Sequence, residues 1–308
     1  MRALVTGGAG FIGSNLVDAL VARGDEVTVV DHLRGGRLAN LAGAQALGAR
    51  VVAVDVTHAT SLRDALAAAQ PEVVFHLAAQ IDVRRSVEDP AFDATVNVAG
   101  TAAVLEAARA AGARRVLLAS TAGVYGDPAR LPTAEDTPPA PLAPYGAGKA
   151  AAEAYLALFT RLYGLSTLAL RLANVYGPRQ SPHGEAGVIA IFCGAAAAGR
   201  PVTRFGDGRQ TRDFVYVGDV VEAFLAAADA DAEGALNVST GRETSLLELI
   251  AELSLETVEG PARIGEVRRS CLDPSAAARE LGWRARTSLR DGLDLTLAAL
   301  EPRRDDAR

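Results

Sequence analysis

The sequence TGGAGFIG, residues 6–13, stands between a short apolar run and a segment with apolar residues at helical spacing. Its glycines at 7, 10 and 13 suit a tight strand-to-helix turn, and those at 8, 10 and 13 fit the G-x-G-x-x-G pattern. Glycine lets a diphosphate approach backbone N–H groups at the positive end of a helix. The stretch predicts a dinucleotide site; an ordinary glycine-rich turn is the alternative.

Two acidic residues follow this turn at the ends of the next predicted strands. Asp31 stands about 20 residues further on, where a carboxylate accepts hydrogen bonds from ribose hydroxyls and repels a 2′-phosphate. It favours NAD over NADP, although Arg34 and Arg37 nearby are candidates for binding a phosphate. Asp55, in VDV, is expected beside the adenine, or alternatively serves as a carboxylate at a helix N-terminus.

The first half of the chain alternates between two kinds of segment. Apolar runs typical of strands occur at Ala3–Thr6, Glu26–Val30, Arg50–Val54, Val73–His76, Val116–Ala119 and Thr167–Leu170, and helical spacing occurs at Phe11–Ala22, Leu62–Ala69, Thr101–Ala111 and Ala150–Tyr163. Strands separated by such helices pair in parallel, with right-handed crossovers. We expect an α/β fold with a doubly wound parallel sheet, the Rossmann fold, over residues 1–175.

The regular alternation of strand and helix patterns ends after about Tyr176, where the sequence becomes rich in turn residues. Shorter helices are expected at Gly187–Ala198, Val217–Ala228, Ser245–Glu252, Pro274–Leu281 and Leu289–Leu300. These elements predict a smaller α+β substrate-binding lobe over residues 176–308. The segment ALNVSTG, residues 235–241, is expected to form a strand that can return to the main sheet.

Composition narrows the class of partner and the compartment. With 308 residues, 49% of them hydrophobic, the chain can bury a full core. Its net charge of -6, without blocks of like charge, argues against nucleic-acid or membrane binding and favours a small molecule. Cys193 and Cys271 are isolated, so neither a metal site nor a disulfide is expected. With no leader or spanning segment evident, we predict a cytoplasmic protein.

The motif YGAGK, residues 145–149, contains the only lysine among 31 basic residues. Tyr145 and Lys149 are four residues apart at the start of a helical segment, so they share a face. A phenol has a pKa near 10 and needs a nearby cation to act as a base at neutral pH. An ammonium is a compact point charge that can also bind ribose hydroxyls, whereas a guanidinium is bulkier. The alternative is a solvated lysine on the helix surface.

Several motifs follow one another in a recognisable order: TGGAGFIG, HLAA (76–79), NVAGT (97–101), STAGVYG (120–126) and YGAGK. Together they resemble the extended short-chain dehydrogenase/reductases. RLANVYGPRQ (171–180) and GDGRQTRDFVYVGDVV (206–221) are similar to the NAD-dependent nucleotide-sugar epimerases and dehydratases, particularly UDP-glucose 4-epimerases. The similarity extends over nearly the whole chain.

The resemblance implies roles for individual residues. Tyr145 would be the acid/base, Lys149 would hold the nicotinamide ribose and lower the pKa of the phenol, and Thr121 would hydrogen-bond the sugar and the phenol, unless it is merely a strand-end threonine. His76 is not expected to act as a base, because it ends a buried strand. NAD would be contacted by Gly7, Gly10, Phe11, Ile12, Gly13, Asp31, Asp55, Val56, Leu77, Ala78, Ala79 and Asn97, together with Tyr145 and Lys149.

The same resemblance implies a nucleotide-sugar site in the second lobe. Its expected residues are Asn174, Thr203, Phe205, Arg212, Arg263 and Ser270. Both arginines would bind the diphosphate through bidentate hydrogen bonds, and surface ion pairs are the alternative for each. Ser270 is small and would leave room for an N-acetylated sugar. Arg268 and Arg269 can instead recognise a carboxylate, which keeps uronic acid substrates open.

The expected activity is that of a UDP-hexose 4-epimerase, which works through a transient 4-keto sugar with retained NAD. Ala122 and Gly123 stand where related dehydratases carry an Asp-Glu pair, which disfavours dehydration. Alternatives are another enzyme of the family, such as a UDP-glucuronate 4-epimerase or a reductase, and a non-catalytic NAD-binding sensor or scaffold.

The alanine-rich helices at Val96–Ala111 and Ala150–Tyr163 are expected to form a homodimer interface, with burial against the sheet alone as the alternative.

Overall fold

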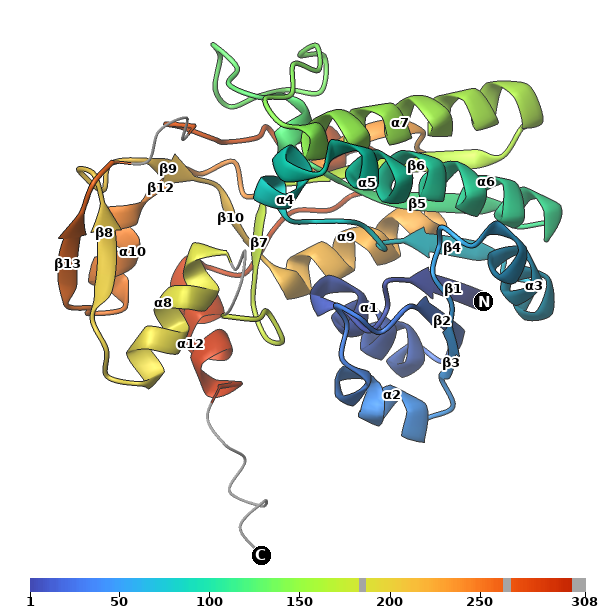
Figure 1. The fold of residues 1–308 in the computed structure, drawn as a ribbon, viewed down its shortest axis with the longest axis horizontal. Helices are drawn as coiled ribbons and strands as arrows, with labels where there is room; N and C mark the ends of the chain where they lie inside the picture. The colour runs from blue at the N-terminus through green and yellow to red at the C-terminus, as the bar shows by residue number, and fades with distance from the viewer. Residues whose placement is uncertain (183–186, 263–266, 301–308) are drawn as a thin grey trace, which may run out of the picture.

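A seven-stranded sheet forms the centre of the computed structural model, which describes residues 1–182, 187–262 and 267–300 (Figure 1). The strand order is β11-β6-β5-β4-β1-β2-β3, and every neighbouring pair is parallel. The strands are β1 (Arg2–Thr6), β2 (Glu26–Asp31), β3 (Arg50–Ala53), β4 (Val73–His76), β5 (Arg115–Thr121), β6 (Ser166–Leu172) and β11 (Gly234–Val238). The expected doubly wound sheet is confirmed.

The strand order reverses between β1 and β4. From β1 the chain builds outward through β2 and β3, and from β4 it builds in the opposite direction through β5 and β6. In open α/β sheets such a reversal marks the place where ligands bind, beyond the carboxyl ends of the strands. The turn predicted from TGGAGFIG lies at this point.

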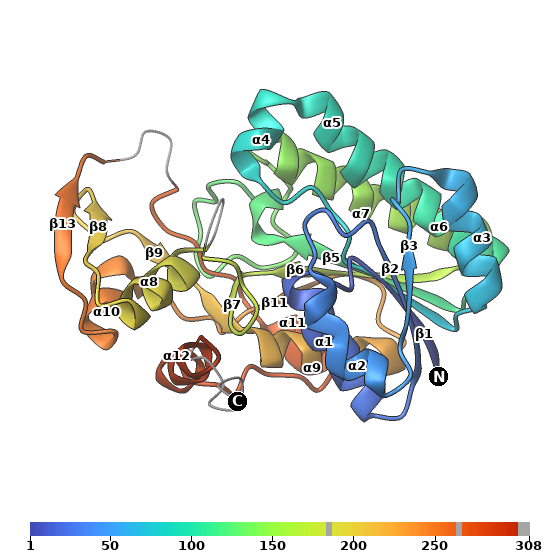
Figure 2. The same ribbon diagram turned by 60° about the horizontal axis from the view of Figure 1, so that its bottom comes forward.

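Helices cover both faces of the sheet (Figures 1 and 2). One face carries α1 (Phe11–Ala22), α9 (Val217–Asp229) and α11 (Ser275–Glu280), and the other carries α3 (Ala59–Ala69), α6 (Gly100–Ala110) and α7 (Pro144–Tyr163). Leu16 and Phe224 are fully buried in the first layer, and Leu66 and Val104 in the second. The sheet is therefore buried on both sides, which explains why its strands are nearly continuous apolar runs.

Short helical segments complete the first half of the chain. They are 3-10 turns at Leu38–Leu41 and Ala122–Val124, α2 (Ala42–Ala46), α4 (Val83–Glu88), α5 (Pro90–Ala94) and a π-helical turn at Thr95–Ala99 that leads into α6. Asp82 and Asp89 cap α4 and α5, each accepting a backbone hydrogen bond three residues on. Together α4, α5 and α6 form an arc beside α7 (Figure 2).

Within the described residues, the smaller lobe consists of three short strand pairs and three helices. The pairs are β7 (Asn174–Tyr176) with β10 (Phe214–Tyr216), β8 (Val202–Phe205) with β13 (Thr257–Gly260), and β9 (Thr211–Arg212) with β12 (Thr244–Ser245); the helices are α8 (Val188–Ala197), α10 (Leu246–Glu252) and α12 (Leu289–Ala298). Tyr176, Phe192 and Leu249 are buried in its own core. The lobe lies beyond the carboxyl ends of the main strands (Figure 1).

The second part of the chain also contributes to the main sheet. Strand β11 pairs with β6 along its whole length, and α9 packs against α1. Trp283, which follows α11, is buried in the same core and donates its indole N–H to the carbonyl of Asp219. Among the helices of the described ranges, none is long and apolar enough to cross a bilayer.

Candidate active site

The turn after β1 requires glycine at two positions. Gly7 has φ +70°, and a Cβ there would lie 2.6 Å from the backbone nitrogen of Ala78. A Cβ on Gly13 would collide with the carbonyl of Gly7. The turn, the first residues of α1 and the segment Leu77–Ala79 therefore approach one another more closely than side chains would allow. These are the backbone elements that the sequence assigns to a dinucleotide diphosphate.

The carboxylate of Asp31 is buried at the end of β2 and shapes the same turn. Its Oδ2 accepts a hydrogen bond from Ala9 N at 3.0 Å, and its Oδ1 accepts one from Leu33 N at 2.8 Å. Each carboxylate oxygen keeps further acceptor capacity for ribose hydroxyls. The guanidinium-bearing residues Arg34 and Arg37 are exposed.

Asp55 lies in the turn between β3 and α3. Its Oδ1 accepts hydrogen bonds from the Thr57 backbone at 3.0 Å and the Thr57 hydroxyl at 2.7 Å. Burial opposes ionisation, but these hydrogen bonds outweigh it and lower the pKa of Asp55. These contacts hold the turn before α3, which begins at Ala59 and has no side-chain cap. The neighbouring Val56 is buried in the core, against Gly100.

His76 is a structural residue at the end of β4. Its Nδ1 lies 2.7 Å from the Thr6 hydroxyl and its Nε2 lies 3.0 Å from the Thr101 hydroxyl. Burial, aided by the positive charge of Lys149, lowers the pKa of His76 to about 3. The ring is therefore neutral at physiological pH and both nitrogens are engaged, which fits the expectation that it is not a base.

The side-chain amide of Asn97, which is expected near the cofactor, forms its hydrogen bonds with other residues of the protein. Its Oδ1 accepts from Gln80 N at 3.0 Å, and its Nδ2 donates to the Gln80 carbonyl at 2.9 Å and to Asp93 Oδ1 at 3.0 Å. Both amide protons are thus spent on the loop after β4 and on α5. Asn97 supports the Leu77–Ala79 segment by fixing the residue that follows it.

Tyr145, Lys149 and Thr121 converge where α7 starts beside the end of β5. Pro144 occupies the first turn of α7, where its fixed φ suits the helix, and the side chains of Tyr145 and Lys149 follow one turn apart. Lys149 is 2% exposed and its Nζ donates to the carbonyl of Ala119 at 3.0 Å. The Thr121 hydroxyl interacts with the phenol of Tyr145 and accepts a hydrogen bond from Gly123 N. The solvated-lysine alternative does not agree with this burial.

The pKa of Tyr145 differs from the expectation. Burial raises it to about 12, and the interaction with Thr121 only partly offsets this, while the charge of Asp93 raises it further. Burial also lowers the pKa of Lys149 to about 8, against the opposing effects of Asp93 and Glu153. The predicted lowering of the phenol's pKa is wrong for the chain by itself, because desolvation disfavours both charged forms and exceeds the local stabilisation.

The smaller lobe contains a cavity of about 770 Å³. Four of the residues expected to bind the nucleotide sugar line it: Asn174, Thr203, Phe205 and Arg212. Phe192, Gln210 and Phe214 contribute further to its wall. The cavity therefore joins apolar and aromatic surface to a guanidinium, a combination suited to a base and a diphosphate.

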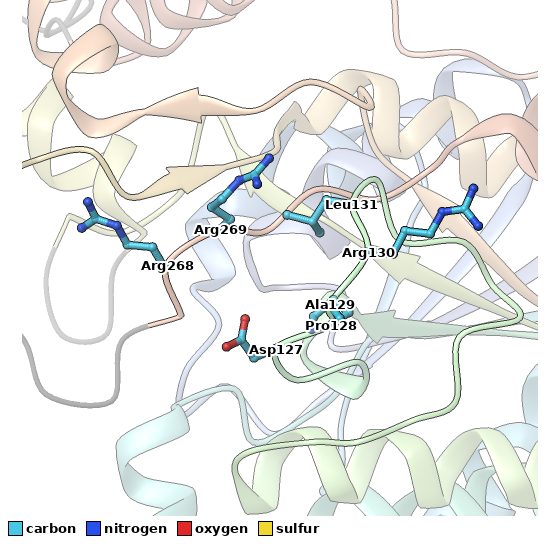
Figure 3. A pocket seen from close by; sticks show the side chains of 7 residues that line it. All are labelled: Asp127, Pro128, Ala129, Arg130, Leu131, Arg268 and Arg269. Carbon is cyan, nitrogen blue, oxygen red and sulfur yellow. The ribbon is translucent and has the colours of Figure 1, made fainter.

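The remaining predicted substrate residues lie elsewhere. Arg263 is outside the described residues. Ser270 is half-buried beside β9, where its backbone N–H donates to the Thr211 carbonyl at 3.3 Å, and it does not line the large cavity. A second cavity, of about 390 Å³, lies between the loop Asp127–Leu131 and the pair Arg268 and Arg269 (Figure 3).

The two arginines of this second cavity are already paired. Arg268 donates to both carboxylate oxygens of Asp207, at 2.8 and 2.5 Å, and Arg269 does the same to Glu243, at 2.9 and 2.5 Å. Figure 3 shows both guanidinium groups directed away from Asp127. The pairing argues against their use as a carboxylate receptor.

Three polar residues near the site escaped the sequence analysis: Gln80, Asp93 and Glu153. Gln80 and Asp93 hold Asn97, and Glu153 binds Arg171 one turn beyond Lys149, at 2.7 Å. The four-residue spacings of Asp93 with Asn97 and of Lys149 with Glu153 were the available signals. Such spacings are frequent in helices, so they do not identify a site on their own.

Comparisons with known proteins agree with this geometry. Residues 3–239 match the model of the NAD dependent epimerase/dehydratase family. The chain is 50% identical to the UDP-glucose 4-epimerase of Mycolicibacterium smegmatis, over 96% of this chain and 97% of the relative.

Two solved structures are also similar. They are the UDP-glucose 4-epimerase of Thermotoga maritima with UDP-glucose, at a TM-score of 0.93, and that of Thermus thermophilus with NAD, at 0.90. Each is 42% identical to this chain, and each alignment covers 97% of this chain and 98% of the other. The chain belongs to the NAD dependent epimerase/dehydratase family.

Proposed function

We propose that the protein is a UDP-hexose 4-epimerase that interconverts UDP-glucose and UDP-galactose through a transient 4-keto sugar. The observation that carries the proposal is the convergence of Tyr145, Lys149 and Thr121 where α7 starts beside the carboxyl end of β5, together with a cavity in the smaller lobe. The 50% identity to a UDP-glucose 4-epimerase over nearly full length supports the choice of substrate.

The residues at the carboxyl ends of β1 and β2 fit NAD. The turn at Gly7 and Gly13 leaves no room for side chains, so only backbone faces a diphosphate there. Asp31 offers acceptor capacity at the end of β2, where a ribose would lie. When bound, NAD supplies a reversible hydride acceptor for the sugar C4. Because the same hydride is returned, an epimerase needs no added cofactor.

Tyr145 is the group that we assign to the proton of the sugar 4-hydroxyl. As phenolate it removes this proton when the 4-keto sugar forms, and as phenol it returns the proton to the other epimer. Lys149 stabilises the phenolate through its positive charge. Thr121 can donate and accept at once, so its hydroxyl can align the sugar oxygen with the phenol.

The cavity in the smaller lobe is assigned to the nucleoside diphosphate. Arg212 would bind the diphosphate, Asn174 would contact the sugar nucleotide, and Thr203 and Phe205 would lie near the base. Firm binding of the nucleotide with a mobile sugar would let either face of C4 reach the same hydride acceptor. We assign Arg263 to the diphosphate, and Ser270 to space for an N-acetyl group, from the family pattern.

The alternatives have less support. Uronic acids would need a cation for their carboxylate, and both Arg268 and Arg269 are bound to protein carboxylates. A reductase that uses NADPH would have to place a 2′-phosphate beside Asp31. A non-catalytic sensor has no need for a buried Lys149 one helical turn from Tyr145. A neutral hexose and NAD are therefore the favoured ligands.

We further propose that the protein is a homodimer formed through α6 and α7. The outer face of α7 exposes four large side chains, Tyr155, Leu158, Leu162 and Tyr163. Light scattering on Leu158→Arg and Leu162→Arg is expected to show a smaller mass than the parent protein. An unchanged mass would exclude this face as the dimer interface.

A reducing compartment suits the buried free cysteines Cys193 and Cys271, so we propose a cytoplasmic enzyme.

The activity test uses the purified protein without added cofactor. Incubation with UDP-glucose, UDP-galactose, their N-acetyl forms and UDP-glucuronate, followed by separation of the products, is expected to give the 4-epimer of at least the first two. Tyr145→Phe is expected to retain bound NAD but to form no epimer. Absence of any 4-epimer with the parent protein would overturn the proposal.

A further inference from the structure

Asp93 is a buried carboxylate between the loop after β4 and helix α7. It is 1% exposed and lies on α5, which packs against α7 (Figures 1 and 2). Its Oδ1 accepts hydrogen bonds from Gln80 Nε2 at 2.9 Å and from Asn97 Nδ2 at 3.0 Å. Its Oδ2 faces Gly148, where a Cβ would lie 3.0 Å away. One oxygen thus holds the loop and the other adjoins the helix that carries Tyr145 and Lys149.

No cation of the described residues forms an ion pair with Asp93, whose hydrogen bonds come from amides alone. Burying a carboxylate without a cation is costly, so such a group usually serves a purpose beyond packing. The nearby carboxylate Glu153 differs, because Arg171 binds it at 2.7 Å. Because no cation in the described part of the chain neutralises Asp93, its negative charge can influence Tyr145 and Lys149 of α7.

We propose that Asp93 is a positioning residue of the catalytic pair: it fixes the loop after β4 against α7 and keeps a negative charge beside Tyr145 and Lys149, which sets the pH range of activity. The measurement of that range rests on the proposed function. The role differs from those of Tyr145, Lys149 and Thr121, because Asp93 acts through them.

The charged and titratable groups around the pair can be assigned one by one. Lys149 interacts electrostatically with His76 from β4, Glu153 from α7 and Asp93 from α5, and Tyr145 interacts with Thr121 and Asp93. His76 is neutral and Glu153 is paired with Arg171. Among these groups, Asp93 is the remaining negative charge without a paired cation, and it raises the pKa of both Tyr145 and Lys149.

The decisive variant is Asp93→Asn, which keeps an acceptor for Gln80 and Asn97 but removes the charge. Without that charge both pKa values fall, so Tyr145 ionises and Lys149 loses its proton at lower pH. Both limbs of the pH profile of kcat/KM for UDP-glucose are expected to move to lower pH by about one unit. The KM for UDP-glucose and the content of bound NAD are expected to change by less than about twofold, since no predicted ligand contact is removed.

Asp89→Asn is the matched control. Asp89 caps the same helix, is exposed and loses the same charge, but solvent screens it from the site. Its pH profile is expected to match that of the parent protein. Asp93→Glu keeps the charge, so it is expected to preserve both limbs even where the longer side chain lowers the melting temperature.

A second measurement does not depend on turnover. The ultraviolet absorbance of tyrosinate, taken as the difference between each protein and its Tyr145→Phe counterpart with NAD bound, follows the ionisation of Tyr145 alone. Asp93→Asn is expected to lower the midpoint by about one unit. An unchanged midpoint overturns the proposal, and inactivity of the parent protein at every pH overturns only the proposed function.

Two further outcomes assign Asp93 to stability alone. One is that Asp93→Asn loses the same fraction of activity at every pH, with both limbs of its pH profile unshifted. The other is failure of every neutral variant, Asp93→Asn and Asp93→Ala, to fold. Either result would overturn the proposal.

Discussion

Lys149 illustrates how much one side chain can depend on its size. It is 2% exposed and donates to the Ala119 carbonyl, and the charges of Asp93 and Glu153 raise its pKa against the effect of burial. A guanidinium at the same position would need more space and would spread its charge over a plane. The site therefore explains why a chain with arginine at its other basic positions has lysine here.

Lys149→Arg is expected to lower kcat by about 10²-fold or more, because the bulkier cation displaces the acid/base pair. The measurement is the steady-state rate of UDP-galactose conversion, with bound NAD determined in parallel. Arg161→Lys, an exposed exchange in the same helix, serves as the control and is expected to leave the rate unchanged. Full activity of Lys149→Arg would refute the role given to the ammonium.

Thr121→Val is expected to shift the pH profile in the opposite direction to Asp93→Asn. The Thr121 hydroxyl lowers the pKa of Tyr145, so its loss raises that pKa and moves the acidic limb of kcat/KM to higher pH. The rate at neutral pH is expected to fall about tenfold, the value of one hydrogen bond. Thr121→Ser should keep both the acidic limb of the pH profile and the rate of the parent protein. An unshifted acidic limb in Thr121→Val would contradict the hydrogen bond assigned between Thr121 and Tyr145.

At the level of residues, the sequence predicted those whose spacing has chemical meaning. Gly7, Gly13, Tyr145 and Lys149 lie in short motifs, and the structure places each of them at the start of a helix or in the turn before one, beyond the end of a main-sheet strand. Asp93 could not be predicted, because its role depends on Gln80, Gly148 and the packing of two helices that are far apart in sequence. The direction of the pKa shift of Tyr145 depends on burial in the same way.

At the level of elements, the first turn of α7 is held against the end of β5 by a glycine. A Cβ on Gly146 would lie 2.5 Å from the Gly123 carbonyl, which is backbone and cannot rotate away. The helix can approach the turn after β5 only because this position lacks a side chain. Tyr145 thereby comes within reach of Thr121.

Gly146→Ala is expected to push α7 away from the turn and to lower the free energy of unfolding by about 1–3 kcal/mol, the cost of overpacking. The rate should fall together with stability, since Tyr145 moves with the helix. Denaturant titration and activity assays measure both. Gly43→Ala in α2, where nothing lies within 4 Å of the added methyl group, is the control; it should leave the rate unchanged and raise the free energy of unfolding by about 1 kcal/mol at most, the difference in helix propensity. Normal activity of Gly146→Ala would show that the contact can relax freely.

The main elements were predictable because burial on both faces leaves a strong periodic signal. The short strands of the smaller lobe were not. Strand β13 has the sequence TVEG and is mostly exposed, so its hydrogen bonds to β8, rather than its own apolar residues, define it. Elements that depend on a partner strand leave little trace in their own sequence.

At the scale of the whole molecule, Asp213 joins segments where the chain crosses between the lobes. The carboxylate is buried, and its oxygens accept hydrogen bonds from Thr240 N at 2.9 Å, Gly241 N at 3.0 Å and Leu272 N at 3.4 Å. These three residues follow β11 or precede α11, so one side chain connects the smaller lobe to the edge of the main sheet.

Asp213→Ala is expected to lower the free energy of unfolding by about 3 kcal/mol, because it leaves several buried N–H groups without acceptors. Equilibrium denaturation measures the loss. Asp229→Ala removes an exposed carboxylate whose only described ion pair is with Arg23, and little change is expected from it. Equal stability of the two variants would show that water replaces the Asp213 hydrogen bonds.

The solitary lysine also gives the molecule an unusual property towards acylating reagents. Its primary amines are limited to the α-amino group of Met1 and the ε-amino group of Lys149, and the latter is almost inaccessible. Because Lys149 is assigned to the nicotinamide ribose, its modification should be slowest while the dinucleotide is bound and should follow the release of that dinucleotide. Mass spectrometry of a single labelled peptide would then report the residence time of the coenzyme, with Met1 as an internal standard.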